Sequence, residues 1–184
     1  MNKHRISPTL PAVDDVHAPR VVLRDGSVAT VRAATDADRN AMRRFFNELS
    51  PESRRKRFFI AGESPAALVE RLYDVVDPAR SVTLVAERHV DGDVRLIAVG
   101  SYAALTASVA EAAFAVDDRF QGKGLGTLLL ERLAVIAAAS GFRRFQATTP
   151  GDNGNMLEVF RDSGFEIRSK SAPGCVDVQL LLTP

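Results

Sequence analysis

The sequence predicts a single α/β (α+β) domain built around one mixed β-sheet. The chain has 184 residues, which is enough for one domain with a substantial core and too few for two comfortable ones. Segments with helical periodicity alternate along it with segments of strand periodicity. Across residues 109–149 a strand, a helix and a second strand follow one another. That order predicts a right-handed crossover between two parallel strands.

Composition and charge argue against several classes of protein, namely nucleic-acid-binding, membrane and secreted proteins. Hydrophobic residues make up 46% and charged residues 26%, as in ordinary globular proteins. The net charge of +1 gives no electrostatic case for a nucleic acid or an anionic membrane as partner. No apolar run approaches the length of a membrane span, and no secretory signal is recognisable at the N-terminus. Because Cys175 is the only cysteine, no internal disulfide can form, and we expect a cytoplasmic protein.

The N-terminal part is expected to hold an arm, a hairpin and three helices. Residues 1–20 contain three prolines and no periodicity, so we interpret them as a flexible N-terminal arm before a domain of residues 21–184. Residues 21–32 predict a small hairpin, because Asp25-Gly26 suits a tight turn. Each helix is predicted from a capping residue or a proline that precedes apolar residues at helical spacing. The expected helices run from Thr35 to about Leu49, from Ser50 to about Phe59 and from Ser64 to about Val76.

The C-terminal part is expected to alternate strands with two more helices. The strands are predicted from short apolar or alternating runs, and glycines mark the helix ends. The expected strands are residues 81–88, 94–105, 109–116, 143–149, 165–170 and 176–182. The expected helices run from the glycine-rich loop to Gly141 and from Asn153 to Ser163.

A glycine-rich loop, Gln121-Gly-Lys-Gly-Leu-Gly126, joins the strand that ends at Val116 to an apolar helix. Such a loop leaves backbone N–H groups free at a helix N-terminus, where they bind phosphate. A Walker-type loop would carry a lysine before the hydroxyl residue, whereas Thr127 follows Gly126 directly. A dinucleotide loop would have G-x-G-x-x-G spacing near the first strand, but this loop comes late and has G-x-G-x-G spacing. The loop matches instead the pattern Q/R-x-x-G-x-G/A, which holds the pyrophosphate of coenzyme A.

A second motif follows, with the order Asn153-x-x-Met156-x-x-x-Phe160-x-x-x-Gly164-Phe165. The loop and this motif together resemble the GNAT superfamily of acyl-CoA-dependent N-acetyltransferases, and the resemblance covers roughly residues 21–184. Two further segments, residues 49–59 and 110–114, look like the catalytic domain of bacterial protein lysine acetyltransferases of the Pat type.

The resemblance implies a fold, a reaction and a cosubstrate. The GNAT fold is a mixed, mostly antiparallel central sheet with a splayed parallel strand pair and helices on both faces. The implied enzyme moves an acetyl group from acetyl-CoA to a primary amine, and the Pat-like segments favour a protein lysine. Two alternatives stay open: a small-molecule amine as acceptor, and a non-catalytic acyl-CoA-binding module that senses its ligand. A homodimer is one of the assemblies that the sequence leaves open. No metal site is expected, because the three histidines are dispersed.

The resemblance also assigns residues to the cofactor. Backbone N–H groups of the loop would hold the pyrophosphate, Phe114 and Val116 would meet the pantetheine and thioester, and Asn153 would hydrogen-bond the pantetheine or cap its helix. The Val116 N–H is the candidate donor to the thioester oxygen as charge develops there. The full set of expected cofactor-binding residues is Phe114, Val116, Gln121, Gly122, Lys123, Gly124, Leu125, Gly126, Thr127, Asn153 and Phe160.

Glu111 is the candidate general base. It lies in the apolar run that leads to the loop, and it matches the glutamate that Pat-type enzymes use. Strand alternation alone does not say whether its side chain faces the cleft. Many GNAT enzymes use a tyrosine as general acid where this chain has Phe160, and neither Tyr73 nor Tyr102 lies in the matching segment, so no general acid is assigned.

A basic run, Arg54-Arg-Lys-Arg57, lies on the expected second helix. It could face an acidic protein surface or the 3′-phosphate of the cofactor. However, a helix points four consecutive residues in different directions. We therefore interpret the run as a solvated helix face.

Overall fold

The computed structural model describes residues 20–59, 66–72 and 77–182. Its strands are β1 (Arg20–Val22), β2 (Val28–Ala33), β3 (Ser81–Val90), β4 (Asp93–Ala104), β5 (Val109–Val116), β6 (Arg144–Pro150), β7 (Ile167–Ala172) and β8 (Cys175–Leu181). Its helices are α1 (Arg39–Glu48), α2 (Pro51–Phe58), α3 (Ala66–Glu70), α4 (Leu125–Ala139) and α5 (Gly154–Asp162), with short 3-10 turns at Asp36–Asp38 and Asp118–Phe120. The expected arm, residues 1–20, lies outside the described residues except for Arg20, which begins β1. The expected third helix is described only in part, as α3.

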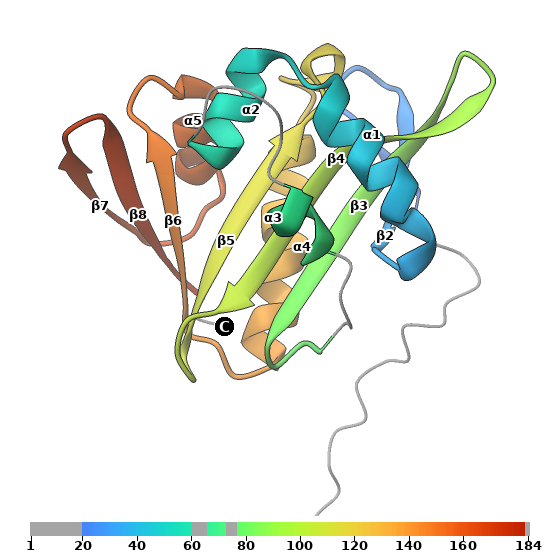
Figure 1. The fold of residues 1–184 in the computed structure, drawn as a ribbon. Helices are drawn as coiled ribbons and strands as arrows, with labels where there is room; N and C mark the ends of the chain where they lie inside the picture. The colour runs from blue at the N-terminus through green and yellow to red at the C-terminus, as the bar shows by residue number, and fades with distance from the viewer. Residues whose placement is uncertain (1–19, 60–65, 73–76, 183–184) are drawn as a thin grey trace, which may run out of the picture.

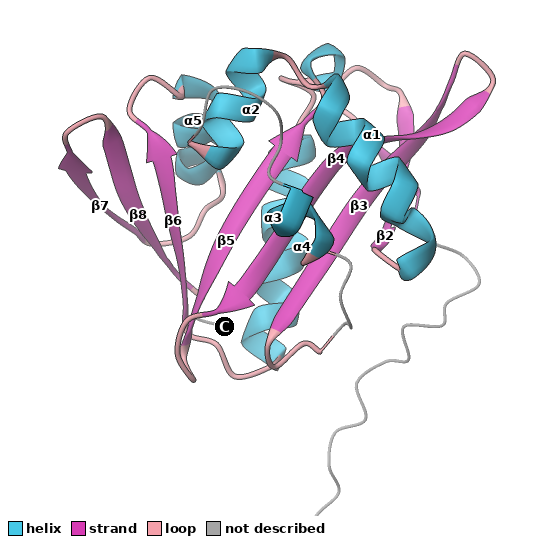
Figure 2. Cartoon of the chain, viewed as in Figure 1, coloured by secondary structure: helices cyan, strands magenta, loops and turns pink. Residues whose placement is uncertain are grey.

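The strands form one sheet in the order β1-β2-β3-β4-β5-β6-β8-β7 (Figures 1 and 2). Neighbouring strands are antiparallel except β5 and β6, which are parallel. Helix α4 connects these two parallel strands. The structure thus confirms the predicted mixed, mostly antiparallel sheet with one parallel pair.

Helices cover both faces of the sheet, as predicted. On one face α4 packs on β3, β4 and β5, and Phe114 of β5 shares a core with Leu129 of α4. On the other face lie α1, α2 and α3, and Ala115 of β5 shares a second core with Phe46 of α1 (Figure 1). Successive residues of β5 therefore point into different cores, as the strand period requires. Within the described part of the chain, no helix is long and apolar enough to cross a membrane.

The parallel strands β5 and β6 pair only at their beginning. The paired residues are Val109–Glu111 with Arg144–Gln146. Beyond this point β5 continues beside β4, and β6 continues beside β8 as far as Pro150. The two strands therefore diverge, and a wedge opens between them toward the loop that precedes α4 (Figure 1).

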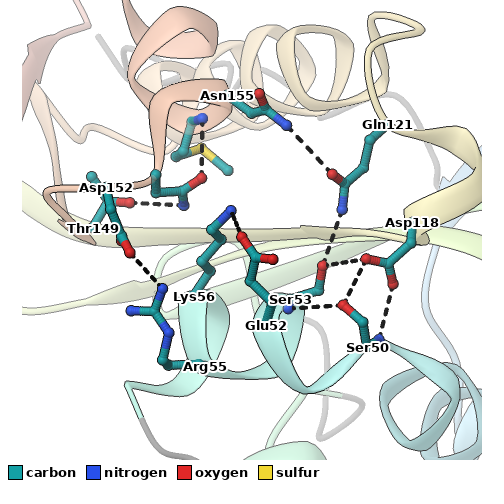
Figure 3. Close-up of polar contacts among 12 residues, drawn as sticks. Ser50, Glu52, Ser53, Arg55, Lys56, Asp118, Gln121, Thr149, Asp152 and Asn155 are labelled. Carbon is teal, nitrogen blue, oxygen red and sulfur yellow. Dashed lines mark hydrogen bonds and ion pairs between the residues drawn. The ribbon is translucent and has the colours of Figure 1, made fainter.

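Helix α2 lies near the open end of this wedge, and its N-terminus is firmly fixed (Figures 1 and 3). Ser50 is the N-cap, since its hydroxyl accepts a hydrogen bond from the Ser53 N–H at 3.1 Å, and Pro51 occupies the first turn. Asp118, from the turn after β5, accepts hydrogen bonds from the Ser50 N–H, the Ser50 hydroxyl and the Ser53 hydroxyl at 2.7–2.9 Å. Burial raises the pKa of Asp118, but these hydrogen bonds outweigh it and hold the pKa below its ordinary value.

Replacing Asp118 with asparagine should loosen the start of α2, because the charged acceptor of its hydrogen bonds is lost. We expect the amides of α2 to exchange with solvent about fivefold faster, equivalent to about 1 kcal/mol at this exposed position. Since the folded pKa lies below the ordinary 3.8, the carboxylate stabilises the fold above that pH and loses its effect as the pH falls further. The difference between wild type and variant should therefore shrink in acid.

Hydrogen–deuterium exchange with peptide resolution measures this effect. Asp93→Asn, in the hairpin between β3 and β4, is the control for loss of one exposed carboxylate. Equal exchange of α2 in wild type and Asp118→Asn at neutral pH would show that this carboxylate does not hold the helix.

Candidate functional site

A cleft of about 170 Å³ occupies the wedge between β5 and β6. Residues 112–116 of β5 and 147–149 of β6 form its two sides. The rest of the lining comes from the loop before α4, the first turn of α4, one face of α2, part of α5, and the single residues Arg24 and Leu49. The segments that the sequence analysis selected separately, the glycine-rich loop and the motif at Asn153, therefore meet at one place.

Most of the expected cofactor-binding residues line this cleft. They are Phe114, Val116, Gln121, Gly122, Gly124, Leu125, Gly126, Thr127, Asn153 and Phe160. Lys123 and the expected base Glu111 do not belong to the lining. The structure thus brings the expected cofactor residues together, while contact with a cofactor stays a prediction.

The backbone of β5 directs hydrogen-bonding groups into the cleft. The Asp117 N–H donates to the Ile97 carbonyl of β4 at 2.9 Å. Because backbone groups of successive strand residues alternate between the two neighbours, those of Val116 and Phe114 point to the opposite side, into the wedge. The Val116 carbonyl indeed accepts a hydrogen bond from the Gln121 side chain at 3.2 Å instead of from β4. The Val116 N–H is therefore directed into the cleft, where the sequence analysis expects an oxyanion donor.

The glycine-rich loop forms an open cradle at the mouth of the cleft. Gly124 has φ 87°, a left-handed conformation that glycine adopts readily, and it precedes α4 without a capping side chain. The first helical bond runs from the Leu128 N–H to the Gly124 carbonyl at 3.0 Å. Helix geometry leaves the N–H groups of residues 125–127 without intrahelical acceptors. These donors, with the positive end of the α4 dipole, fit a pyrophosphate group.

Gly126 allows α4 and α5 to approach each other closely beside the cradle. A Cβ atom at this position would lie 3.0 Å from Cγ2 of Val159, which is closer than real Cβ contacts normally come. The last glycine of the motif is therefore explained by helix packing, and it also brings α5 to the edge of the cleft.

Lys123 is engaged by the protein itself, which the sequence analysis did not anticipate. Its ammonium pairs with Asp25 of the β1–β2 turn at 2.9 Å, and it lies 4.9 Å from the centre of the Phe120 ring. The Lys123 and Ser27 hydrogen bonds hold the pKa of Asp25 well below its usual range. Lys123 thus fastens the β1–β2 turn to the loop.

Arg24 supplies a cation on the cleft side of the same loop. Its backbone N–H donates to the Lys123 carbonyl at 3.2 Å, and its side chain lies against Gly124 and lines the cleft. Among the described residues, its guanidinium has neither a hydrogen bond nor an ion pair. Sequence reasoning missed Arg24, because Asp25-Gly26 was interpreted only as a hairpin turn.

Two of the expected cofactor-binding residues, Gln121 and Asn153, are also hydrogen-bonded within the protein. The Gln121 side chain donates to Ser53 of α2 at 3.1 Å and accepts from Asn155 of α5 at 3.4 Å, so it bridges two helices. Asn153 is buried and caps α5, accepting from the Met156 N–H at 3.4 Å and donating to the Thr149 hydroxyl at 2.9 Å. The capping interpretation of Asn153 therefore describes its side chain.

Glu111 is exposed and lies where β5 and β6 begin to separate. It shares a face of β5 with Ala115, which belongs to the core under α1 and α2. The half-buried Arg57 of α2 lies within electrostatic reach of it: burial lowers the pKa of Arg57 to about 10, and the charge of Glu111 opposes this shift. The structure thus settles the face of Glu111, toward α2 and at the narrow end of the wedge.

No side chain in the described part of the cleft takes the place of the missing tyrosine. Phe160 is buried at the expected position. Tyr102 is buried elsewhere and donates to the Pro78 carbonyl at 2.7 Å, and burial raises its pKa to about 12. Tyr73 lies outside the described residues. Among the described residues, no three histidine, cysteine or carboxylate side chains gather in a way that could hold a metal ion.

The basic run of α2 is not the solvated face that we expected, because its four side chains are half-buried and each has a different environment. Arg54 donates to the carbonyls of Asn47 and Leu49 at 2.8 Å. Arg55 pairs with Asp152 of the loop before α5 at 2.6 Å (Figure 3). The other two, Lys56 and Arg57, line the cleft. The four residues do point in different directions, as predicted.

Comparison with known proteins shows a consistent set of relatives. The model of the acetyltransferase (GNAT) family matches residues 39–165. The acetyltransferase PA5475 of Pseudomonas aeruginosa is 34% identical over 146 residues, which cover 78% of this chain and 77% of that protein. The acetyltransferase Pat of Mycolicibacterium smegmatis is 33% identical over 115 residues, but these cover only 33% of Pat.

Solved structures agree with these relatives. The GNAT domain of S. lividans PAT has a TM-score of 0.77 and 33% identity, and the match covers 89% of this chain and 96% of that domain. A cAMP-binding acyltransferase from Mycobacterium smegmatis has a TM-score of 0.62 and 26% identity, and the match covers 90% of this chain and 47% of that protein. These matches confirm the fold that the sequence resemblance implied.

The cradle predicts a strong effect of Gly124→Glu. A glutamate would be strained at positive φ and would place a negative charge among the N–H donors, so we expect acetyl-CoA affinity to fall at least about a hundredfold. Isothermal titration calorimetry measures the affinity directly. Gly141→Glu is the matched control, since Gly141 has φ 96° with open space around it and follows the other end of α4. Normal affinity in Gly124→Glu would remove the loop from the binding site.

Arg24 and Lys123 should differ in their effect on cofactor affinity. We expect Arg24→Ala to weaken coenzyme A binding roughly three- to tenfold through loss of a phosphate contact. Lys123→Ala should change affinity less and lower the melting temperature more, because Lys123 ties the β1–β2 turn to the loop. Titration with dephospho-coenzyme A tells which phosphate Arg24 contacts: an unchanged Arg24→Ala effect assigns the pyrophosphate, and a lost effect assigns the 3′-phosphate. Equal affinities for wild type and Arg24→Ala would contradict the assignment.

Proposed function

The chain belongs to the GNAT acetyltransferase family, and we propose that it transfers the acetyl group of acetyl-CoA to a protein lysine. The observation that carries the proposal is the cleft between β5 and β6, where the cradle of α4 and the backbone groups of β5 are directed into one space. Acetyl-CoA anchored by its pyrophosphate at the cradle would extend along β5 toward Glu111.

The protein would hold acetyl-CoA by its pyrophosphate and by its amide-containing pantetheine arm. The N–H groups of residues 125–127 would bind the pyrophosphate, with Arg24 beside them. The wedge-facing groups of Phe114 and Val116 would meet the pantetheine and the thioester of the donor, much as a neighbouring strand would. When bound, acetyl-CoA supplies an acyl group activated as a thioester. The Val116 N–H would then stabilise charge that develops on the carbonyl oxygen.

Glu111 would remove the proton that the acceptor amine loses. A lysine of pKa about 10.4 is neutral only about once in a few thousand molecules at pH 7, so proton removal limits the attack. Because Glu111 is exposed and lies beside the cleft, the proton would pass through a water molecule. After Glu111 has taken one proton from the ammonium, the C–N bond forms and the C–S bond breaks. The nitrogen loses its second proton to solvent, and the departing thiolate takes a proton from solvent. The products are an acetylated amine and coenzyme A.

The acceptor is inferred from similarity to Pat and to the GNAT domain of PAT. The chain spans one third of the length of the Mycolicibacterium Pat that it matches, so the activity of that whole protein comes to this chain only as a proposal. A non-catalytic acyl-CoA sensor is the second candidate, because Phe160 replaces the usual acid and Glu111 lies outside the cleft lining. A panel of lysine peptides and small amines with acetyl-CoA separates the two candidates. Release of free thiol supports catalysis, whereas binding of acetyl-CoA without release from any acceptor supports the sensor.

Glu111→Gln should lower kcat about a hundredfold at neutral pH and leave the dissociation constant of acetyl-CoA unchanged. The pH dependence of kcat should also change, because the proton relayed by water no longer has the Glu111 carboxylate as its acceptor. Thiol release across a pH series and calorimetry measure the two quantities. Glu131→Gln, on the exposed side of α4, is the control. An unchanged rate and pH profile would exclude Glu111 as base.

A further inference from the structure

Helix α2 presents two cations to the cleft. Ser53, Lys56 and Arg57 have the spacing of one helical face, and all three line the cavity. Lys56 projects between Arg55 and Ser53 (Figure 3). The sequence motif that the proposed function leaves unused, the basic run, therefore places half of its charge in the cleft.

Among the residues that the structure describes, Arg57 has no anionic partner of its own. It makes no hydrogen bond and no ion pair with a described residue, and its guanidinium carbon lies 5.0 Å from the centre of the Phe58 ring. Glu111 acts on it electrostatically without forming an ion pair. The side chain is half-buried, and it stays charged at neutral pH because a pKa of about 10 is still high. Partial burial removes some of the water that would otherwise bind the donors of this guanidinium, and an anion brought by a ligand would offset that cost.

Lys56 can join such an anion. Its present partner is the exposed Glu52, one turn earlier on the same helix, at 2.5 Å. Exposed pairs of this kind contribute little, so a better acceptor can replace Glu52. On the face of β5 that points toward α2, Ala113 also lines the cleft, and its small side chain leaves room for an additional group. The two acidic residues of the lining, Glu158 and Asp162, come from α5, which packs against α4 on the opposite face from α2.

We propose that Lys56 and Arg57 form a carboxylate subsite beside the transferred acyl group. A guanidinium binds a carboxylate through two parallel hydrogen bonds, and an ammonium adds charge without fixed geometry. The carboxylate has two possible sources: the end of a dicarboxylic acyl group on coenzyme A, or an acidic residue next to the acceptor amine. The inference deepens the proposed function and rests on it.

The first arm of the test concerns the acyl group and uses binding alone. Calorimetry compares succinyl-CoA with butyryl-CoA, whose acyl groups have equal chain length and differ by the carboxylate. If the acyl group is the source, the wild type binds succinyl-CoA about tenfold more tightly, and Arg57→Gln abolishes the preference. Arg57→Lys should restore part of it. Arg168→Gln, on β7, controls for loss of one exposed arginine.

The second arm concerns the acceptor. Two lysine peptides are compared, one with aspartate and one with asparagine beside the lysine, by kcat/KM and by calorimetric binding in the presence of coenzyme A. If the acceptor is the source, the aspartate peptide is preferred about tenfold, and Arg57→Gln removes the preference. Lys56→Gln serves as an independent variant should Arg57→Gln fold poorly, with a smaller loss expected.

The outcomes separate the subsite from the proposed function. A preference for the carboxylate in either arm that depends on Arg57 or Lys56 supports the subsite and identifies its source. Acetyl transfer without such a preference in either arm, or a preference that both variants retain, would overturn the subsite and leave the proposed function standing. Failure of the wild type to bind any acyl-CoA would overturn both.

Discussion

The early separation of two parallel strands is the constraint on which the rest of this structure depends. A strand inside a sheet normally satisfies its backbone groups on both sides, because unpaired N–H and C=O groups away from water are costly. Here β5 loses β6 as a neighbour after Glu111, while β6 turns its pairing to β8. The wedge-facing groups of Phe114 and the N–H of Val116 are therefore left for a ligand. A molecule with amide groups along its length, such as pantetheine, suits an edge of this kind.

The surroundings of the wedge are held in place by aspartates from loops. Asp118 fixes the N-terminus of α2, Asp152 pairs with Arg55 of the same helix, and Asp25 binds Lys123 of the glycine-rich loop. Each carboxylate joins segments that the chain order separates. α2 is thus fixed over the wedge at both edges, and its remaining cations, Lys56 and Arg57, are presented to the cleft. The backbone N–H groups of the loop therefore stay available to a cofactor, whereas the side chain of Lys123 binds Asp25 within the protein.

The sequence was sufficient wherever function depends on local pattern. Three features are determined by short stretches of consecutive residues, and each lies where it was expected: the glycine-rich loop, the cap at Asn153 and the crossover through α4. What could not be predicted depends on contacts between distant segments. Which side of the sheet Glu111 faces depends on where α2 packs. The ion pair of Lys123 depends on Asp25, in a turn nearly a hundred residues earlier in the chain. The spacing of Ser53, Lys56 and Arg57 was a usable signal, since it marks one face of a helix inside the basic run.

The central claim, that acetyl-CoA binds along the free edge of β5, is tested most directly by amide chemical shifts in ¹⁵N-labelled protein titrated with acetyl-CoA. We expect large shifts for Phe114, Val116 and residues 125–127, whose N–H groups face the wedge or the cradle. We expect small shifts for Ala113 and Ala115, whose N–H groups point toward the neighbouring strand β4. Equal shifts for successive residues of β5, or large shifts confined to other parts of the protein, would contradict binding along this edge.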